Sequence, residues 1–316
     1  MPNTRIYWLH ALSPTHAGIG RGVGYIDLPI DRDGVTGWPI IRGSSFKGVW
    51  VDHHRATREA REANTDEGRL LKAAFGVAGD DNNSNAGALI ATDAQLVCLP
   101  VRSFRGTFAW CTSPLCLQVL RRTLELAGVT ELPAVPTIRA DNTAHHVTGT
   151  ALKEGPRIFL EDLDFDATDC LTAAAWAAKL AAWVFPTDTV WQEQFKKRFC
   201  VLPDVAFDFL SETGTEVHTR VRIDDDTKTV VGGALWTEES LPAETILAGL
   251  VQCDRVFSKD GKDVEVAGTK LDSAAILKRF ATNDPNKPLV LQIGGKATVG
   301  RGQMRCVFTP VTGGGQ

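Results

Sequence analysis

Apolar residues recur at two different spacings along this chain, and each spacing predicts a different kind of element. Residues 5–13 form an apolar, β-rich run that predicts a buried first strand, which ends at Pro14. Residues 217–223 and 229–236 alternate between apolar and polar positions on either side of a turn-like segment, so they predict a β-hairpin. Further strands are predicted at 88–101, 106–111, 245–253, 289–293 and 304–309.

Helical segments are predicted at several other places. The segment from Ser45 to about Asn64 is expected to be one helix, polar and exposed in its later part. Ser113 followed by Pro114 is typical of an N-cap and first helical residue, so a helix should begin there and end near Gly128. The Ala- and Trp-rich run 171–185 predicts a buried helix. Further helices are predicted at 68–75, 186–199 and 271–280.

The order of these elements indicates the fold class. Helices follow single or paired strands and do not alternate strictly with them, which favours an α+β fold with a mostly antiparallel sheet over a doubly wound one. Residues 130–155 show no period and predict a projecting loop or insertion. Because the first and last strands should both lie in the core, we expect residues 1–316 to form a single domain with a flexible tail at 313–316.

Composition and cysteine usage indicate the environment. The chain has 43% hydrophobic and 23% charged residues, which is ordinary for a soluble protein. Its seven cysteines are scattered singly without zinc-site spacing, and the odd number argues against a disulfide framework, so we expect a reducing, cytoplasmic location. No apolar run approaches the length of a membrane span and no signal peptide is apparent, so no membrane partner is expected.

The distribution of charge matters more than its sum. The formal net charge of −4 opposes nucleic-acid binding. However, residues 270–305 contain seven Lys or Arg and two Asp, and residues 100–122 contain four Arg and no acid. Acidic residues collect at 161–169 and 224–226. This segregation suits a basic groove on an acidic body, and ordinary solvated surface charge is an equally good interpretation.

Residues 16–48 are the part of the chain with the clearest functional pattern. They contain eight glycines, and their first half has no period, which is typical of a long loop that becomes ordered around a ligand. Their second half predicts a short strand and then a helix that begins at SSFKG. Backbone N–H groups at a helix N-terminus favour phosphate, and a lysine in the first turn is easier to explain beside an anion. The first phosphate-binding candidate therefore comprises Arg42, Ser44 and Ser45 (either serine as N-cap), and Lys47.

Two further segments are candidates for phosphate binding. GGKATVGRG at 294–302 lies between two predicted strands. It is not a Walker motif, because the spacing differs and no helix follows, and a following strand excludes a dinucleotide fingerprint. An unrelated tight β-turn is the alternative. A weaker candidate is VRSFRG, which contributes Arg102 and Arg105.

Three acidic or imidazole side chains are candidates for catalysis. Asp27 lies in the glycine-rich loop, where a carboxylate can hold a divalent cation, orient a 2′-hydroxyl or act as a general base. Loop chemistry alone favours the simpler role of capping nearby backbone amides. His16 could shuttle a proton or contact phosphate, although a lone histidine is more often structural. Glu238, followed by Glu239, could equally be an exposed acid at a strand end.

Four motifs, in this order, carry a resemblance that covers nearly the whole chain. They are GYIDLPIDRDGVTGWPIIRGSSFKGV, LVCLPVRSFRGTFAWCTSP, GGALWTEESLP and LQIGGKATVGRGQMR. Together they resemble the RAMP superfamily of CRISPR-associated proteins, and more narrowly the repeated backbone subunit of the type III-B (Cmr) effector complex. The resemblance implies a ferredoxin-like (RRM-like) core with a β-hairpin thumb at about 217–240 and helical insertions.

The same resemblance implies a function. Several copies would stack along a guide RNA with other Cmr-type subunits, and Gly295, Lys296 and Arg301 would line the guide backbone. Asp27 matches the position that relatives use to cleave target RNA, with Mg²⁺ or Mn²⁺ assisting attack by the neighbouring 2′-hydroxyl, whereas Asp31 and Asp33 do not match it and should be solvated. Glu238 would lie near the cleavage site of an adjoining subunit. The alternatives are a purely architectural RNA-binding subunit and a standalone endonuclease that processes guide RNA.

Overall fold

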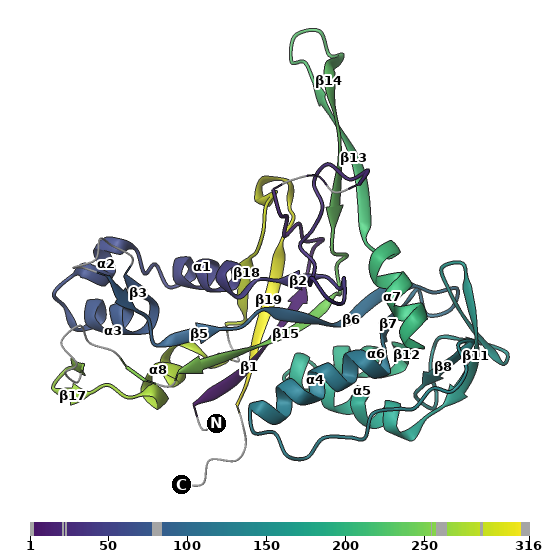
Figure 1. The fold of residues 1–316 in the computed structure, drawn as a ribbon, viewed down its shortest axis with the longest axis horizontal. Helices are drawn as coiled ribbons and strands as arrows, with labels where there is room; N and C mark the ends of the chain where they lie inside the picture. Colours follow the sequence, from purple (N-terminus) through teal and green to yellow (C-terminus); the bar gives the residue numbers. More distant parts are fainter. Residues whose placement is uncertain are drawn as a thin grey trace.

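The computed structural model describes residues 3–310 except 21, 23, 78–83, 254, 257–263, 285 and 286. A long sheet crosses the molecule, and one β-hairpin projects far from it (Figure 1). Along the sheet, the strands follow the order β18 (Leu289–Gln292), β19 (Gln303–Pro310), β1 (Thr4–Ala11), β15 (Ile246–Cys253), β6 (Ala94–Arg102), β7 (Phe108–Thr112), β12 (Phe199–Val201), β8 (Thr143–His146), β11 (Leu163–Asp169), β10 (Arg157–Leu160) and β9 (Lys153–Glu154).

Most strand pairs in this sheet are antiparallel. Among the described strands, only β8 with β11 and β7 with β12 run parallel. Two short strands pair beside the main path, β2 (Ile40–Ile41) with β6 and β5 (Leu89–Ala91) with β15. β1 and β19 are antiparallel neighbours from Arg5 opposite Pro310 to Ala11 opposite Met304. The prediction of a mostly antiparallel sheet is therefore confirmed, and the first and last strands, both expected in the core, are also neighbours.

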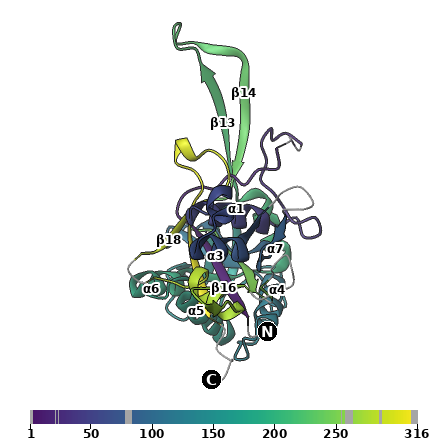
Figure 2. The same ribbon diagram turned by 90° about the vertical axis from the view of Figure 1, so that its left-hand side faces the viewer.

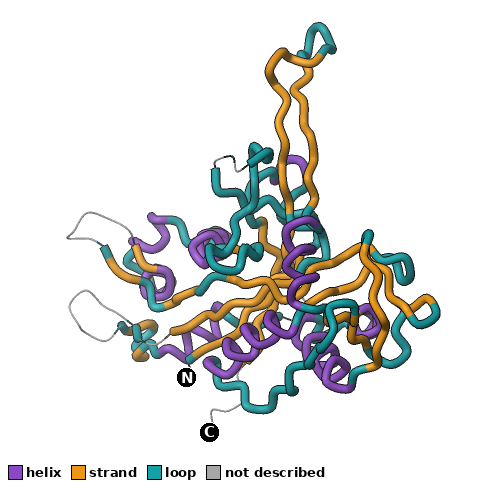
Figure 3. Tube along the Cα trace, turned by 45° about the vertical axis from the view of Figure 1, so that its right-hand side comes forward, coloured by secondary structure: helices purple, strands orange, loops and turns teal. Residues whose placement is uncertain are grey.

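Helices cover both faces of the sheet (Figure 3), which explains why the first strand is buried at nearly every position. Tyr7 and Leu9 of β1 pack into one core, whereas Ile6 and Trp8 pack into a second core on the opposite face. The first core is covered by α1 (Gly43–His53), α3 (Asp66–Phe75) and α8 (Ser273–Phe280), and the second by α4 (Pro114–Leu126), α5 (Leu171–Val184) and α6 (Thr189–Arg198).

Local capping signals account for several helix boundaries. Ser113 caps α4 as predicted, its Oγ accepting from Cys116 N at 3.2 Å. The helix expected over 45–64 is instead two, because Thr57 caps a separate α2 (Arg58–Glu62) by accepting from Ala60 N at 3.1 Å. Helix α7 (Asp204–Thr213) was not predicted. The remaining short elements are β3 (Gly76–Val77), β4 (Asn85–Ala86), β16 (Glu265–Val266), β17 (Thr269–Lys270) and the 3₁₀ turn η1 (Ala297–Val299).

The loop predicted over 130–155 is only partly irregular. Residues 130–142 form no helix or strand, but β8 and β9 follow and belong to the sheet. Ala144 and His146 of β8 are buried, yet a strand of four residues is too short to show a reliable period. The predicted tail at 313–316 lies outside the described residues.

The hairpin expected near 217–240 is confirmed as β13 (Glu216–Ile223) paired with β14 (Val230–Ser240). It stands clear of the body in two perpendicular views (Figures 1 and 2). Its two ends return to the body close together, so its root is fixed while its length is exposed. Within the described residues, no helix is long and apolar enough to cross a membrane.

Candidate functional site

Three segments that are distant in the sequence meet at the root of the hairpin. Because Ala11 pairs with Met304, the loop that leaves β1 and the loop that enters β19 emerge at the same edge of the sheet. Thr15 and Leu241 exchange two backbone hydrogen bonds of 2.8 Å, which ties the end of the hairpin to the first loop. The fold therefore gathers the glycine-rich loop after β1, the hairpin root and the glycine-rich loop before β19.

Asp27 is exposed and held by the hairpin. Its Oδ2 accepts from Thr237 N at 2.8 Å and from Thr237 Oγ1 at 3.0 Å, and Asp27 N donates to the same hydroxyl at 3.0 Å. The Thr237 backbone N–H and then its hydroxyl hold the pKa of the Asp27 carboxyl below its usual value. The capping role expected from loop chemistry is thus real, but the amide comes from 210 residues away.

This geometry decides what Asp27 can do chemically. The second oxygen, Oδ1, has no hydrogen-bond partner among the described residues, so it is free for a ligand. A carboxylate with a lowered pKa is ionised at neutral pH and is a weak base. Asp27 is therefore suited to binding a cation or orienting a hydroxyl group, and less suited to removing a proton.

His16 is buried between the three segments. It is 7% exposed, and its Nδ1–H donates to the Glu239 carbonyl at 2.6 Å, which leaves Nε2 as the acceptor in the neutral ring. Its own carbonyl accepts from Gly295 N at 2.9 Å. No hydrogen bond joins His16 to Asp27 in the described structure. These contacts support the structural interpretation of His16.

Glu238 and Glu239 are not the exposed acids that the sequence left as an alternative, because they are 6% and 2% exposed. Glu238 Oε1 accepts from Lys296 Nζ at 2.7 Å and from Trp236 Nε1 at 2.6 Å. Burial acts to raise the pKa of Glu238, but these hydrogen bonds outweigh it, and the net effect is a lowered pKa. Glu239 accepts from Ile30 N at 3.0 Å and pairs with Arg32 at 2.6 Å, which fixes the first loop.

Strand geometry separates Asp27 from Glu238. Thr237 and Glu238 are consecutive in β14, so their side chains point to opposite faces of the hairpin. Asp27 bonds to the Thr237 hydroxyl, whereas Glu238 faces Lys296 on the other side. One chain therefore does not bring these two carboxylates into one catalytic pair.

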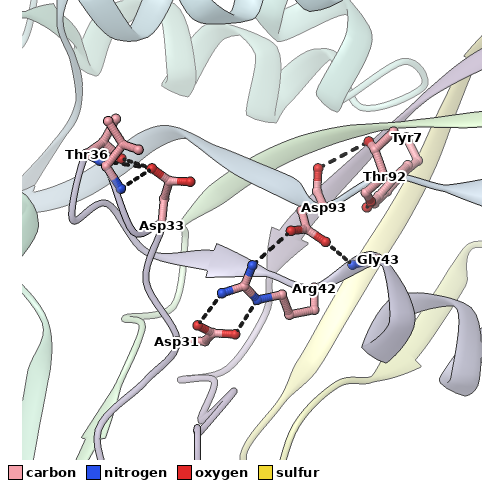
Figure 4. Close-up of polar contacts among 9 residues, drawn as sticks. Tyr7, Asp31, Asp33, Thr36, Arg42, Gly43, Thr92 and Asp93 are labelled. Atoms are coloured by element: carbon pink, nitrogen blue, oxygen red, sulfur yellow. Dashed lines mark hydrogen bonds and ion pairs between the residues drawn. The ribbon is translucent and has the colours of Figure 1, made fainter. Parts of the chain in front are cut away.

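The start of α1 differs from the sequence prediction. The predicted serine caps are wrong, because Arg42 is the N-cap residue and the first helical N–H, from Gly43, donates to Asp93 Oδ1 at 2.7 Å (Figure 4). Ser44 and Ser45 are exposed. Asp93 lies on a distant loop, so no local pattern could reveal it.

Arg42 is tied to acids. Its guanidinium donates to Asp31 at 2.6 and 3.0 Å and to Asp93 at 3.2 Å (Figure 4). The hydrogen bonds that Arg42 donates to Asp31 raise the pKa of Arg42 above its ordinary value. The prediction that Asp31 is solvated is wrong, because it is committed to this pair. Asp33 is likewise bonded, accepting from Thr36 N at 2.9 Å.

Lys47 does not occupy the first turn of α1, because that helix already begins at Gly43. Its ammonium is half-buried and donates to the Leu89 carbonyl at 2.7 Å. Burial lowers the pKa of Lys47 below its ordinary value. In the RNA-free protein, Lys47 therefore has a structural role, because its ammonium binds the main chain of β5.

A small pocket joins the first and second phosphate-binding candidates. Its volume is about 150 Å³, and it combines main chain from both glycine-rich loops with side chains of both charge signs. It is lined by Ala17, Gly18, Asp31, Arg42, Ser45, Gly294 and Gly295.

The loop at 294–302 is a tight turn that only glycine permits at its start. Gly294 has φ +82°, and a Cβ there would lie 2.2 Å from the His16 carbonyl oxygen. Lys296 reaches Glu238, and its Nζ lies 5.9 Å from the ring centre of Trp236. Arg301 pairs with Glu216 of β13 at 3.0 Å. The loop is thus a tight turn that presents two cations at the hairpin root, and phosphate binding by it stays a prediction.

Arg102 and Arg105 lie elsewhere. Arg102 pairs with Glu161 at 3.4 Å, and Arg105 pairs with Glu154 of β9, so both belong to the far end of the sheet. Five of the predicted RNA-binding cations share one feature, since each pairs with an acidic side chain. They are Arg42, Arg102, Arg105, Lys296 and Arg301.

Sequence reasoning missed three residues at this site. Thr237, Asp93 and Glu216 all act through partners that are distant in the chain. Thr237 alone left a usable signal, because it stands beside Glu238 in a strand and must face the other side.

Comparisons with known proteins agree with this architecture. The model of the RAMP superfamily matches residues 8–305, so this chain belongs to the RAMP superfamily. Within it, the chain is 32% identical over 311 residues to the CRISPR system Cmr endoribonuclease Cmr4 of Pyrococcus furiosus, covering 97% of this chain and 96% of that protein.

Solved structures of this group share the fold. Oligomeric Cmr4 from Pyrococcus furiosus superposes with a TM-score of 0.71 at 24% identity, covering 98% of this chain and 99% of that one. A chain of the type III-B Cmr-beta complex bound to cognate target RNA superposes with a TM-score of 0.67 at 20% identity, covering 96% of both chains.

Proposed function

We propose that this chain is a backbone subunit of a type III-B CRISPR ribonucleoprotein. Several copies bind along a guide RNA, together with other Cmr-type subunits, and each copy cleaves complementary target RNA. The observation that carries the proposal is the Asp27 carboxylate. It is exposed, has one free oxygen and is fixed at the root of a projecting hairpin, in a chain similar over 97% of its length to a Cmr endoribonuclease.

Asp27 also fits a divalent cation. Mg²⁺ commonly binds through one or two carboxylates while waters and substrate phosphates complete its coordination. No cluster of three or more His, Cys, Asp or Glu occurs among the described residues, so a complete protein cage is absent there and this mode is the one that fits. Mg²⁺ or Mn²⁺ held by Oδ1 of Asp27 would neutralise charge on the scissile phosphate. Asp27 itself orients the nucleophilic 2′-hydroxyl.

The two faces of the hairpin root suit a stack of copies. Asp27 lies with Thr237 on one face, and Glu238 lies with Lys296 on the opposite face. In a head-to-tail stack, the Glu238 face of one copy would approach the Asp27 face of the next. A contribution of Glu238 to cleavage would then come from the neighbouring subunit.

The finer description of the core belongs to the same proposal. Four adjacent strands have the order β19, β1, β15, β6, with α1 after β1 and α8 between β15 and β19, both against the same core. This arrangement supports a ferredoxin-like (RRM-like) unit with the remaining elements as insertions.

The test uses the assembled, guide-loaded complex and a complementary target RNA. Asp27→Ala should abolish cleavage while assembly and target binding stay near normal, because it removes one exposed carboxylate and no core contact. Asp225→Ala, which removes an exposed carboxylate at the hairpin turn, is the matched control and should cleave normally. Retained cleavage by Asp27→Ala would reject Asp27 as the catalytic group. A wild-type complex that binds target tightly and never cuts it would identify an architectural subunit.

A further inference from the structure

Thr237 makes three hydrogen bonds with Asp27, two through its side-chain hydroxyl and one through its main-chain N–H. Its main-chain N–H and its hydroxyl both donate to Oδ2, and the hydroxyl accepts from Asp27 N. We propose that Thr237 is a positioning residue for cleavage, which fixes the rotation of the Asp27 carboxylate so that Oδ1 faces the substrate. The inference rests on the proposed function, because it assigns a role relative to Asp27.

The backbone explains why the side chain is needed. Leu28 N donates to the Thr237 carbonyl at 3.0 Å, and Glu239 N donates to the Leu28 carbonyl at 2.9 Å. The loop therefore adds to the edge of β14 like a short extra strand, which sets the position of the Asp27 main chain. A ladder of this kind leaves the side-chain torsions of Asp27 free, and in an exposed residue they would sample several rotamers.

Two donors to one oxygen remove that freedom. The Thr237 N–H and hydroxyl bind Oδ2 from one side, so Oδ1 is the oxygen left for a cation or hydroxyl group. The hydroxyl has a single proton and a second acceptor nearby, the Tyr25 carbonyl at 3.2 Å. Because ionised acceptors make the stronger hydrogen bonds, the Thr237 hydroxyl donates to the Asp27 carboxylate and not to the Tyr25 carbonyl. The lowered pKa of Asp27 agrees with this assignment.

The arrangement also links the hairpin to the chemistry. Thr237 belongs to β14, so any displacement of the hairpin root moves both donors of Asp27. RNA that displaces the exposed hairpin would thereby change the orientation of the carboxylate.

The experiment compares Thr237→Val with Thr237→Ser in the assembled complex. Valine keeps the shape and the main-chain N–H but removes the hydroxyl, whereas serine keeps the hydroxyl. Thr219→Val is a matched control, because Thr219 is an exposed residue and the cross-strand partner of Thr237. We expect Thr237→Val to lower the single-turnover cleavage rate about tenfold, the effect of losing one hydrogen bond to a charged group. Affinities for guide and target should change less than twofold.

The serine variant separates positioning from a general loosening of the hairpin. Thr237→Ser keeps the hydroxyl that donates to Asp27, so its cleavage rate should stay close to that of wild type. A loosened hairpin would slow cleavage in both variants.

Each outcome bears on the inference separately from the proposed function. If Asp27→Ala is inactive but Thr237→Val cleaves like wild type, the inference is wrong and the proposed function stands. Equal losses in Thr237→Val and Thr219→Val, or failure of serine to restore the rate, would also overturn it. If Asp27→Ala cleaves normally, Asp27 is not the catalytic group, and the inference falls together with that assignment.

Discussion

Glu216→Gln should strengthen guide-RNA binding, although it removes an ion pair from the folded protein. Arg301, a proposed guide contact, donates to Glu216 at 3.0 Å, and the two side chains are 14% and 32% exposed. The Glu216 carboxylate occupies Nη1 of this guanidinium and weakens the attraction of Arg301 for RNA phosphate. The carboxylate therefore competes with phosphate, and neutralising it should favour RNA.

The size of the effect follows from burial. Exposed ion pairs contribute about 0–1 kcal/mol, whereas hydrogen bonds to charged groups contribute about 1.5–3 kcal/mol. A pair that is partly exposed on the Glu216 side should contribute about 1 kcal/mol. RNA-free Glu216→Gln should lose about that much stability and bind guide RNA about fivefold more tightly. The two measurements move in opposite directions, which a simple loss of folding cannot produce.

The assay is fluorescence anisotropy of labelled guide RNA at several salt concentrations, paired with denaturant unfolding of the RNA-free protein. The salt dependence should become steeper by about 0.7 in log–log slope, because Glu216 no longer takes up a counterion when phosphate displaces it. Glu193→Gln makes the same charge change at an exposed pair with Lys196 on α6, and it should leave affinity unchanged. Unchanged or weaker binding by Glu216→Gln, or an equal gain in Glu193→Gln, would refute the reasoning.

Three more predictions concern the same site. A target RNA should be cut several times at one constant interval, because stacked copies each bring one Asp27, and sequencing the 3′ ends of the fragments checks this. A target with 2′-deoxy residues at the scissile positions should stay intact at those positions. The pKa of Glu238 is lowered by Lys296 and Trp236 in spite of burial, so its stabilising contribution is present above the ordinary glutamate pKa and is lost as pH falls through the lowered value. Acid unfolding of Glu238→Gln should therefore depend less on pH over that range than unfolding of the wild type, and equal slopes would contradict the assignment.

Secondary structure could be predicted most accurately from the sequence where the pattern was long or depended only on neighbouring residues. The first strand, the α5 helix and the Ser113 cap each depend on neighbouring residues, and each appears where it was expected. Short strands such as β8 could not be predicted, because four residues carry too little period. The cap of α1 also could not be predicted, since Asp93 reaches Gly43 from a loop 50 residues away.

The candidate site shows the same limit at finer scale. Three consecutive residues of β14 each hold a different partner: Thr237 bonds Asp27, Glu238 bonds Lys296, and Glu239 bonds Ile30 and Arg32. The sequence marks this stretch only as a strand end with two acids, because Asp27, Lys296, Ile30 and Arg32 come from loops far away in the chain. Alternation along the strand sends Thr237 and Glu239 to one side and Glu238 to the other. The loop that carries Asp27 and the loop that carries Lys296 are thus fastened to opposite faces of one strand, so a movement of the hairpin root must reach both loops at once.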